Sequence, residues 1–412
     1  MWRDSQKVER VCGRVFLILF LFALPLVWVR IFLGGKIDAF DNEMRFADTM
    51  PELNAHTVLH GEFQEQIEGV LADQMPASET IRAKKLGFDD LIFDNLSWIA
   101  RKKDSNYRLV GDDVYVYKDY DYLLRPLLKD TWTNFKYNDS EESAKIRNVL
   151  ERSNNYFGNL PIKNKYIYII TTDQAVDFDH LGESSYVDQI LSYYPSFKSS
   201  RLEIPDFDTY MKYYLRNDHH WNYEGSYTGY KDIIKLMLGE DEKVMEPVEK
   251  VVFDYNTFGS KSMNSHYYKF KEKFTAYRFD FAEREVEING NKTDEYGDQE
   301  KHFKQRDLRS ELGSIGYGNF YGLDPAVVHY NYKQPEKSNL IMIGHSDTNA
   351  INGLVASHFN ETWVIDPRFC SRAEFEKIIS ENNIDYLLLA PNTSDFIPEM
   401  QDEPKGYEGA IQ

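Results

Sequence analysis

Hydrophobic and polar positions change period several times along the chain. Residues 165–171 and 339–344 are short, almost wholly apolar runs, the pattern of strands buried on both faces of a sheet. Two similar runs lie at 362–366 and 385–389, and residues 372–380 between them have helical spacing. Strands alternating with helices in this way predict an α/β fold, a three-layer sandwich with a mostly parallel sheet.

The remaining patterns predict further elements around this core. Phe63, Ile67, Val70 and Leu71 fall at helical spacing. The stretch at 112–124 has the pattern of a small β element, and 250–290 includes alternating runs typical of antiparallel strands in an insertion. Further helices are expected at 126–157, 206–216 and 223–238.

The longest apolar run covers residues 15–33 and is interrupted only by Arg30. It is long enough to cross a hydrocarbon layer of roughly 30 Å. Four basic residues precede it: Arg3, Lys7, Arg10 and Arg14. The pattern predicts one transmembrane helix that anchors the chain in the cell membrane, with the C-terminal part outside the cytoplasm. No small-residue cleavage site follows, which favours an anchor over the alternative, a cleaved signal peptide.

These patterns divide the chain into four expected parts. They are a cytoplasmic tail (1–14), a transmembrane signal anchor (15–33), a tether with an N-terminal accessory segment (34–155) and the main α/β domain (156–412), which carries an insertion near 245–335.

Composition narrows the class of protein. Of the 412 residues, 42% are hydrophobic and 15% aromatic, enough for a sizeable core. The formal net charge of −19 argues against nucleic acid as a partner. Only Cys12 and Cys370 are present, which makes a disulfide framework improbable.

Candidate chemistry lies in two places. The sequence RNDHHWNYEGSY (216–227) falls in the break between two predicted helices, and Ser346 follows the strand at 339–344. In open α/β sheets, functional groups gather at the carboxyl ends of strands. Asp218 and His220 offer an orienting carboxylate and a base within one turn, and backbone N–H groups near Ser346 could stabilise an oxyanion. We therefore expect Ser346, His220 and Asp218 to be catalytic, with no metal and no cofactor.

Four motifs together resemble a known family. They are DHHWNYEGSYTGY (218–230), FGSK (258–261), IGYGNFYG (315–322) and LIMIGHSDTNAINGLVASHF (340–359). Over roughly residues 60–400 the chain resembles the DHHW protein family, related to the alginate O-acetyltransferases in the SGNH hydrolase superfamily. The Asp-x-His-Trp element precedes the Ser element in these relatives, as it does here.

The resemblance implies a fold and a function for the chain. The domain at 156–412 would be SGNH-like, with Ser346 as nucleophile, His220 as base and Asp218 as acid. The implied function is a serine O-acetyltransferase or acetylesterase acting on an exported cell-surface polysaccharide through an acyl-serine. A multi-spanning membrane acyltransferase would supply the acyl group.

Other residues near the motifs have expected supporting roles. Trp221 should pack beneath the Asp-His-His turn, and His219 should be structural. Asn349 and Asn352 should cap or face solvent, and Asp347 and His345 depart from the residues usual beside the nucleophile. The candidates for oxyanion or substrate binding are Gly259, Tyr317, Asn319 and His345.

Two other classes of function stay open. The letters Asp-His-His also occur in phosphoesterases that bind two Mn²⁺ ions and need several further Asp and His ligands. Asp173, Asp177 and Asp179 follow the strand at 165–171, but no matching cluster of His accompanies them. The second is a catalytically silent polysaccharide-binding or assembly protein on the same fold. Within the enzyme class, the residues do not separate transferase from esterase.

Overall fold

The protein divides into two compact units, residues 1–96 with 310–314 and residues 97–309 with 315–412. In the first unit, strands β1 (Ala39–Phe40) and β2 (Arg45–Phe46) pair antiparallel, and helix α3 (Glu62–Asp73) confirms the predicted helical spacing. This computed structural model describes residues 25–27, 29, 39–40, 45–50, 62–75, 84, 88, 91, 106–111, 113–126, 135–179, 186–257, 259–265, 267, 269–293, 299, 302–304, 316–322 and 324–396.

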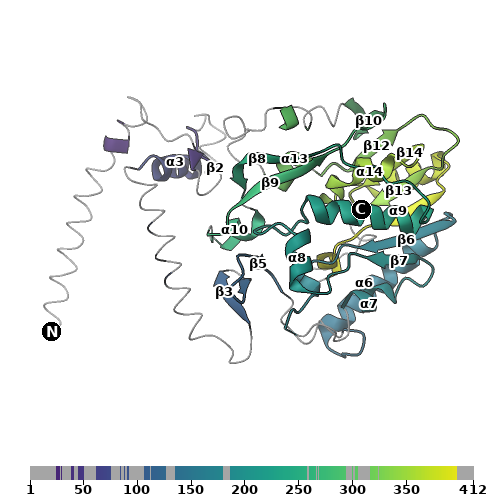
Figure 1. The fold of residues 1–412 in the computed structure, drawn as a ribbon, viewed down its shortest axis with the longest axis horizontal. Coiled ribbons are helices and arrows are strands. Elements are labelled where there is room, and N and C mark those ends of the chain that lie inside the picture. Colours follow the sequence, from purple (N-terminus) through teal and green to yellow (C-terminus); the bar gives the residue numbers. More distant parts are fainter. Residues whose placement is uncertain are drawn as a thin grey trace. The chain divides into compact units, whose positions relative to one another are not determined.

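The second unit is built on an eight-stranded sheet with the order β11-β10-β12-β14-β13-β15-β6-β7 (Figure 1). The four predicted apolar runs are its central strands β6, β13, β14 and β15. The strands are β6 (Asn164–Ile169), β7 (Lys198–Arg201), β10 (Glu285–Ile288), β11 (Asn291–Thr293), β12 (Val327–Asn331), β13 (Leu340–Ile343), β14 (Glu361–Ile365) and β15 (Tyr386–Leu389).

The sheet is mixed, so the prediction of a mostly parallel sheet is wrong. Strands β14, β13, β15, β6 and β7 run parallel, whereas β12, β10 and β11 each pair antiparallel with their neighbours. Asn289 and Gly290 join β10 to β11 with φ angles of 49° and 77°, which a tight hairpin requires. The segment assigned to an insertion thus extends the main sheet by three antiparallel strands.

The predicted transmembrane helix is also corrected. Across the described part of the chain, no helix has both the length and the apolar character needed to cross a membrane. Of the predicted span 15–33, only residues 25–27 and 29 are described.

Helices cover both faces of the sheet because side chains alternate along each strand. Tyr166 and Tyr168 of β6 join one hydrophobic core with α8 (Phe207–Tyr213), α9 (Tyr223–Leu238) and α14 (Asn352–Ala356). Ile167 and Ile169 point to the second core, with α6 (Glu141–Gly158), α7 (Tyr186–Leu191) and α15 (Arg372–Glu381). Figure 1 shows α9 on one side of β6 and β7 and α6 on the other.

Capping residues set the helix bounds. The side chain of Asn222 accepts hydrogen bonds from the N–H groups of Glu224 and Gly225, and Gly239 ends α9 at φ 99°, so the predicted bounds 223–238 are confirmed. Helix α6 begins at Glu141 because Ser140 caps it, not near residue 126 as predicted. Residues 127–134 of that prediction lie outside the described residues.

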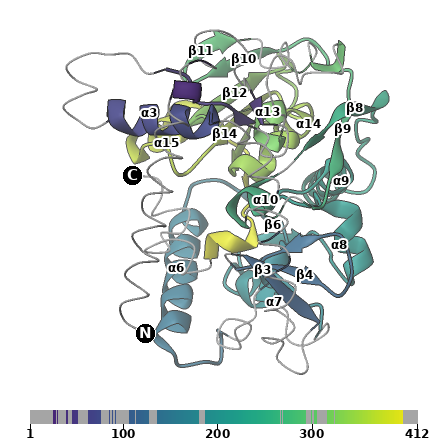
Figure 2. The same cartoon turned by 90° about the vertical axis from the view of Figure 1, so that its left-hand side faces the viewer.

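Smaller elements surround the carboxyl edge of the sheet. Strands β8 (Glu249–Thr257) and β9 (Glu272–Arg278) form a ribbon beside α9 (Figure 2), and Tyr277 of this ribbon packs on Tyr223 at the start of α9. A second small sheet confirms the predicted β element near 112–124. The remaining elements are β3 (Tyr107–Gly111), β4 (Val114–Tyr117), β5 (Leu123–Leu124), α10 (Ser260–Ser265), α13 (Tyr317–Tyr321) and the 3₁₀ helices η1 (Asp173–Ala175), η2 (Ser346–Ala350) and η3 (Thr393–Phe396).

Candidate active site

The Asp-His-His turn is a tight loop between α8 and α9. Tyr214 and Trp221 form an antiparallel bridge across its base, and the N–H of Leu215 donates to the carbonyl of His220 at 3.2 Å. Trp221 is fully buried, as predicted, and its Nε1 donates to the carbonyl of Asp347 at 2.7 Å. The loop is therefore fastened both to its own stem and to η2.

Asn217 attaches the loop to the β8–β9 ribbon. Its amide nitrogen donates to the carbonyls of Thr257 and Phe270, at 3.1 and 3.0 Å, and its Oδ1 accepts the N–H of Gly259 at 2.8 Å. That N–H is thus engaged, and the structure gives no support to an oxyanion role for Gly259. A Cβ at Gly259 would lie 2.2 Å from the Cβ of Asp218, so glycine is required because the Asp218 side chain packs directly against this backbone.

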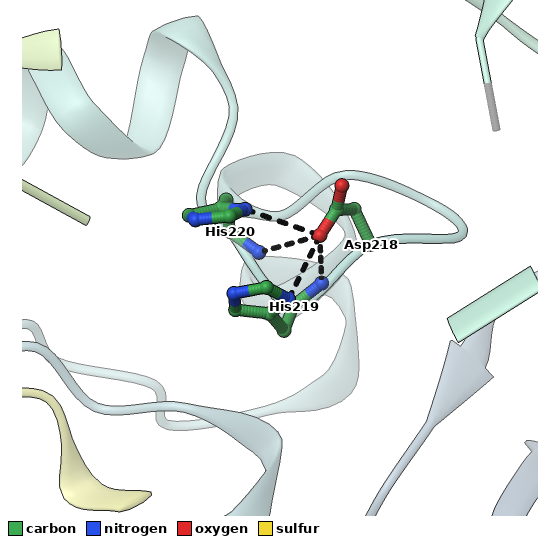
Figure 3. A group of neighbouring side chains, drawn as sticks. All are labelled: Asp218, His219 and His220. Carbon is green, nitrogen blue, oxygen red and sulfur yellow. Dashed lines mark hydrogen bonds and ion pairs between the residues drawn. The ribbon is translucent and has the colours of Figure 1, made fainter. Parts of the chain in front are cut away.

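Asp218 gathers the polar groups of the loop around one oxygen (Figure 3). Its Oδ1 accepts the N–H of His219 at 2.6 Å and the hydroxyl of Ser260 at 3.2 Å, and lies 3.1 Å from Nδ1 of His220. Burial alone would raise the pKa of Asp218. The charges of His220 and His219 and their hydrogen bonds outweigh burial, and hold this pKa well below its usual range.

His220 connects Asp218 to Ser346. Its Nδ1 faces Asp218, and its Nε2 lies 3.1 Å from Oγ of Ser346, a residue 126 positions away in the sequence. The ring stacks on Tyr317 with centroids 4.0 Å apart and planes 5° apart. The structure therefore brings together the three predicted catalytic residues, in the order carboxylate, imidazole and hydroxyl. Their catalytic role stays a prediction.

His219 points to the other side of the loop. Its Nδ1 lies 2.6 Å from Oγ of Ser260 and 3.0 Å from the same oxygen of Asp218. Burial lowers the pKa of His219, but hydrogen bonding to Asp218 and the charge of that carboxylate leave it raised. These contacts are those of a residue that supports Asp218.

Ser346 begins η2 directly beyond the carboxyl end of β13. The first N–H groups of a helix have no acceptor within the helix itself. Among the described residues, the N–H groups of Ser346 and Asp347 donate to no protein acceptor. Backbone N–H groups without an acceptor beside a nucleophile are the kind of donor that stabilises an oxyanion.

A second charged cluster adjoins Ser346. Nε2 of His345 lies 3.0 Å from both carboxylate oxygens of Asp395, and its Nδ1 lies 3.6 Å from Oδ2 of Asp347. Burial would lower the pKa of His345, but the charge and hydrogen bond of Asp395 and the charge of Asp347 raise it to about 9. His345 is therefore a cation at neutral pH, held between two carboxylates and not directed at Ser346.

The two remaining predicted substrate contacts have structural partners instead. Tyr317 is buried and its hydroxyl donates to the carbonyl of Asp347 at 2.7 Å, so it supports His220 and η2 from below. Asn319 is exposed, and its Oδ1 accepts the N–H of Gly316 at 3.2 Å, which caps α13. A role of either side chain in substrate binding stays a prediction.

The metal alternative has one candidate cluster in the described part of the chain. Asp218, His219 and His220 can offer ligand atoms within 4.8 Å of one another. The aspartates considered as further ligands of a two-metal site are engaged elsewhere. Asp173 forms a buried ion pair with Lys261 at 2.6 Å, and Asp177 and Asp179 bind groups of the β3 segment. The surroundings of Asp218 therefore fit a relay to Ser346 better than a two-metal centre.

Several supporting residues were not predicted. They are Asn217, Ser260 and Asp395, which contact the predicted site residues Gly259, Asp218 and His345, respectively, from distant segments. The position of Asn217 directly before Asp218 was the available signal, because Asn and Asp side chains commonly order loops by bonding to backbone groups. The sequence carried no comparable signal for Asp395.

No protein-family model matches the chain, and no curated protein matches it. Several solved structures are similar. PatB1 of Bacillus cereus with a sulfonyl adduct is 16% identical with a TM-score of 0.47, over 67% of this chain and 95% of that one. A DHHW family protein from Eubacterium siraeum is 15% identical with a TM-score of 0.49, over 73% of this chain and 95% of that one. The O-acetyltransferase domain of Pseudomonas putida AlgJ is 8% identical with a TM-score of 0.35, over 69% and 91%.

The similar structures thus include both groups that the sequence motifs resemble, the DHHW family and an O-acetyltransferase. Their TM-scores all lie below 0.5. The function is therefore inferred from the geometry of the site and from the sequence motifs.

Proposed function

We propose that the protein is a serine-dependent acyl-transfer enzyme in which Ser346 carries the acyl group. One observation carries the proposal: Nε2 of His220 lies 3.1 Å from Oγ of Ser346 while Nδ1 of the same ring lies 3.1 Å from Asp218. This is the arrangement in which an imidazole removes a hydroxyl proton while a carboxylate fixes its tautomer.

The first half of the reaction forms an acyl-enzyme. Oγ of Ser346 attacks the carbonyl carbon of the acyl donor, and its proton passes to Nε2 of His220. The carbonyl oxygen becomes an oxyanion, stabilised by the N–H groups of Ser346 and Asp347. When the intermediate collapses, the bond to the leaving group breaks, and the leaving oxygen takes the proton from His220.

The second half transfers the acyl group to a hydroxyl. His220 removes a proton from the incoming hydroxyl, whose oxygen attacks the carbonyl of the acyl-serine. Collapse of the second tetrahedral intermediate returns that proton to Oγ of Ser346. A sugar hydroxyl as acceptor makes the enzyme a transferase, and water makes it an esterase.

The acyl group and acceptor we propose are acetyl and a cell-surface polysaccharide. The support is the set of four motifs that resemble the DHHW and alginate O-acetyltransferase families. We also propose that the second unit acts outside the cytoplasm and receives acetyl groups from a membrane acyltransferase.

A serine-directed fluorophosphonate probe tests the proposed chemistry. The full chain should be labelled on the peptide that carries Ser346, and Ser346→Ala should remove the label. Ser357→Ala, a change of another hydroxyl on the same segment, is the matched control and should leave the label intact. Loss of activity with a chelator would instead support a metal site at Asp218, His219 and His220. An unlabelled, folded chain would support a catalytically silent binding protein.

A further inference from the structure

A pocket opens to solvent beside the start of α9, between the β8–β9 ribbon and η2. The space along its walls is about 590 Å³, a figure that includes open solvent. Five aromatic rings from α9, from β9 and from the segment after β9 form much of its wall, and each is only partly buried. They are Tyr223, Tyr227, Tyr277, Phe279 and Phe281.

The rings of the wall pack against one another mainly edge to face. The Tyr223 and Tyr277 centroids lie 4.8 Å apart with planes at 89°, and those of Tyr227 and Tyr277 lie 5.6 Å apart with planes at 76°. The aromatic wall continues through Phe279 to Phe281, whose centroids lie 6.2 Å apart. A ligand entering the pocket would meet several ring surfaces without displacing a core residue.

This pocket adjoins the candidate active site. Asn349 and Ala350 line it, and both belong to the 3₁₀ helix that Ser346 begins. In such a helix residues three apart lie on the same face, so Asn349 follows Ser346 by one turn, about 6 Å along the axis. Tyr321 also lines the pocket, and its ring packs 4.8 Å from Tyr317, which stacks on His220.

The pocket wall is neutral but not wholly apolar. None of the described residues that line it has a charged side chain, and Ser226, Gln299 and Asn349 add polar groups to the aromatic surface. Negative charge lies directly behind the wall: the hydroxyl of Tyr227 donates to Glu246 at 2.7 Å and that of Tyr223 to Glu224 at 3.0 Å.

Three basic groups lie near the rings of the wall: Lys250, Arg284, and Lys231, whose Nζ lies 4.7 Å from the centre of the Tyr227 ring. Nζ of Lys250 donates to the hydroxyl of Tyr223 and lies 4.4 Å from the centre of its ring. The guanidinium of Arg284 lies 4.6 Å from the centre of the Phe281 ring, outside the lining. No cation is among the described lining residues, so the wall itself has no ion-pairing group for a carboxylate or phosphate.

We propose that this aromatic pocket is a subsite for an uncharged pyranose unit of the acceptor glycan. The proposal rests on the proposed function, which supplies the glycan as acceptor. A pyranose has C–H faces that stack on aromatic rings and hydroxyls that bond to amide and hydroxyl groups, which matches this mixed wall. The lining has no charged side chain to pair with the carboxylates of a polyuronate. A fatty chain would bury the polar groups without partners.

Binding of oligosaccharides to the purified full chain tests the subsite. Isothermal titration would compare neutral glucan, mannan and N-acetylhexosamine oligosaccharides with an oligouronate. At least one neutral oligosaccharide should bind, and the oligouronate should bind at least tenfold more weakly.

Two substitutions of Phe281 test whether the oligosaccharide binds in this pocket. Phe281→Ala should weaken binding of the neutral oligosaccharide about tenfold, and Phe281→Leu, which keeps an apolar side chain but removes the ring, should weaken it similarly. Tyr137→Ala is the aromatic control, since this side chain is 74% exposed and outside the pocket lining; it should bind normally. Circular dichroism would show whether each variant is folded.

The outcomes separate the subsite from the proposed function. Binding that is lost in both Phe281 variants, in a chain whose Ser346 is not labelled by fluorophosphonate, supports the subsite and overturns the enzyme. A labelled chain that binds no neutral oligosaccharide, or binds it equally after either change of Phe281, overturns the subsite and leaves the enzyme. Preferential binding of the oligouronate, or of a fatty acyl micelle, also overturns the subsite.

Discussion

At the scale of single residues, the site depends on one carboxylate oxygen shared by several donors. Oδ1 of Asp218 receives the backbone N–H of His219 and the hydroxyl of Ser260, and faces Nδ1 of His220. The shared oxygen fixes the direction of both imidazole rings. His220 turns its free nitrogen to Ser346, and His219 turns to Ser260.

This difference predicts unequal effects of two substitutions. Asp218→Asn should lower the rate of ester turnover by a factor on the order of 10⁴ if the carboxylate acts as in a serine-protease triad, because the imidazole would lose its correct tautomer. His219→Gln should have a much smaller effect, since His219 does not contact Ser346. Steady-state turnover of a small acetyl ester measures both. Equal losses in the two variants would show that the site needs the His219 imidazole as much as the Asp218 carboxylate, as a bound metal would.

His345 makes stability depend on pH in a defined direction. Its pKa is raised to about 9, whereas an unperturbed His titrates near about 6.5. Between these values the folded chain holds a proton that the unfolded chain has lost. The free energy of unfolding should therefore fall as pH rises through this window, and the stabilisation is fully present only below it.

Substitution of His345 tests this direction. His345→Gln should have a smaller decrease in the free energy of unfolding between pH 6 and pH 9.5 than the unmodified chain, as measured by denaturant titration. An identical decrease in both proteins would contradict the assigned charge of His345.

At the scale of elements, the segments near the site are positioned by close backbone approaches. Helix α9 passes so near to Trp221 that a Cβ at Gly229 would lie 2.5 Å from the Trp221 ring. Trp221 in turn donates to the carbonyl of Asp347 in η2. The start of α9, the Asp-His-His loop and the segment of Ser346 are thus linked through one indole.

Gly229→Ala should therefore disturb both stability and the site. The added methyl group should cost about 1–3 kcal/mol of unfolding free energy, as overpacking commonly does, and should reduce ester turnover by displacing the loop. Gly318→Ala is the control, because a Cβ there has no neighbour within 4 Å. A stable, fully active Gly229→Ala protein would show that Trp221 does not position His220.

The sequence predicted these elements unequally. Strands β6, β13, β14 and β15 were expected because each is a buried apolar run whose pattern is local. Strand β12 was not expected. Its side chains alternate between buried and partly buried positions only from Val328 onward, and its antiparallel pairing with β14 depends on a partner distant in sequence. Pairing direction is not encoded in the period of a single strand, which is why the mixed sheet was missed.

The residues of the predicted site also divide into those with a local sequence signal and those that depend on distant contacts. Asp218 and His220 share one short loop, and Ser346 follows a recognisable strand, so their approach followed from the expected fold. The partners Asn217–Gly259 and His345–Asp395 join segments 42 and 50 residues apart. Such contacts depend on the path of the chain in three dimensions, and residue types alone do not reveal them.

At the scale of the whole molecule, charge and architecture agree with a neutral ligand. The chain has a net charge of −19, and the aromatic pocket offers no cation among its described lining residues. The sheet brings Ser346 to its carboxyl edge, and the β8–β9 ribbon holds the Asp-His-His loop there through Asn217. The relay is therefore assembled from segments that span both the sheet and the elements added to it.

Detection of an acetyl-serine intermediate tests the central claim most directly. The full chain would be mixed with 4-nitrophenyl acetate, quenched in acid and digested for mass spectrometry. We expect one acetyl group on Ser346, none on Ser346→Ala, and a strongly reduced amount on His220→Ala. The control Ser357→Ala should be acetylated like the unmodified chain. Acetylation confined to another residue, or undiminished in His220→Ala, would contradict Ser346 as a nucleophile activated by His220.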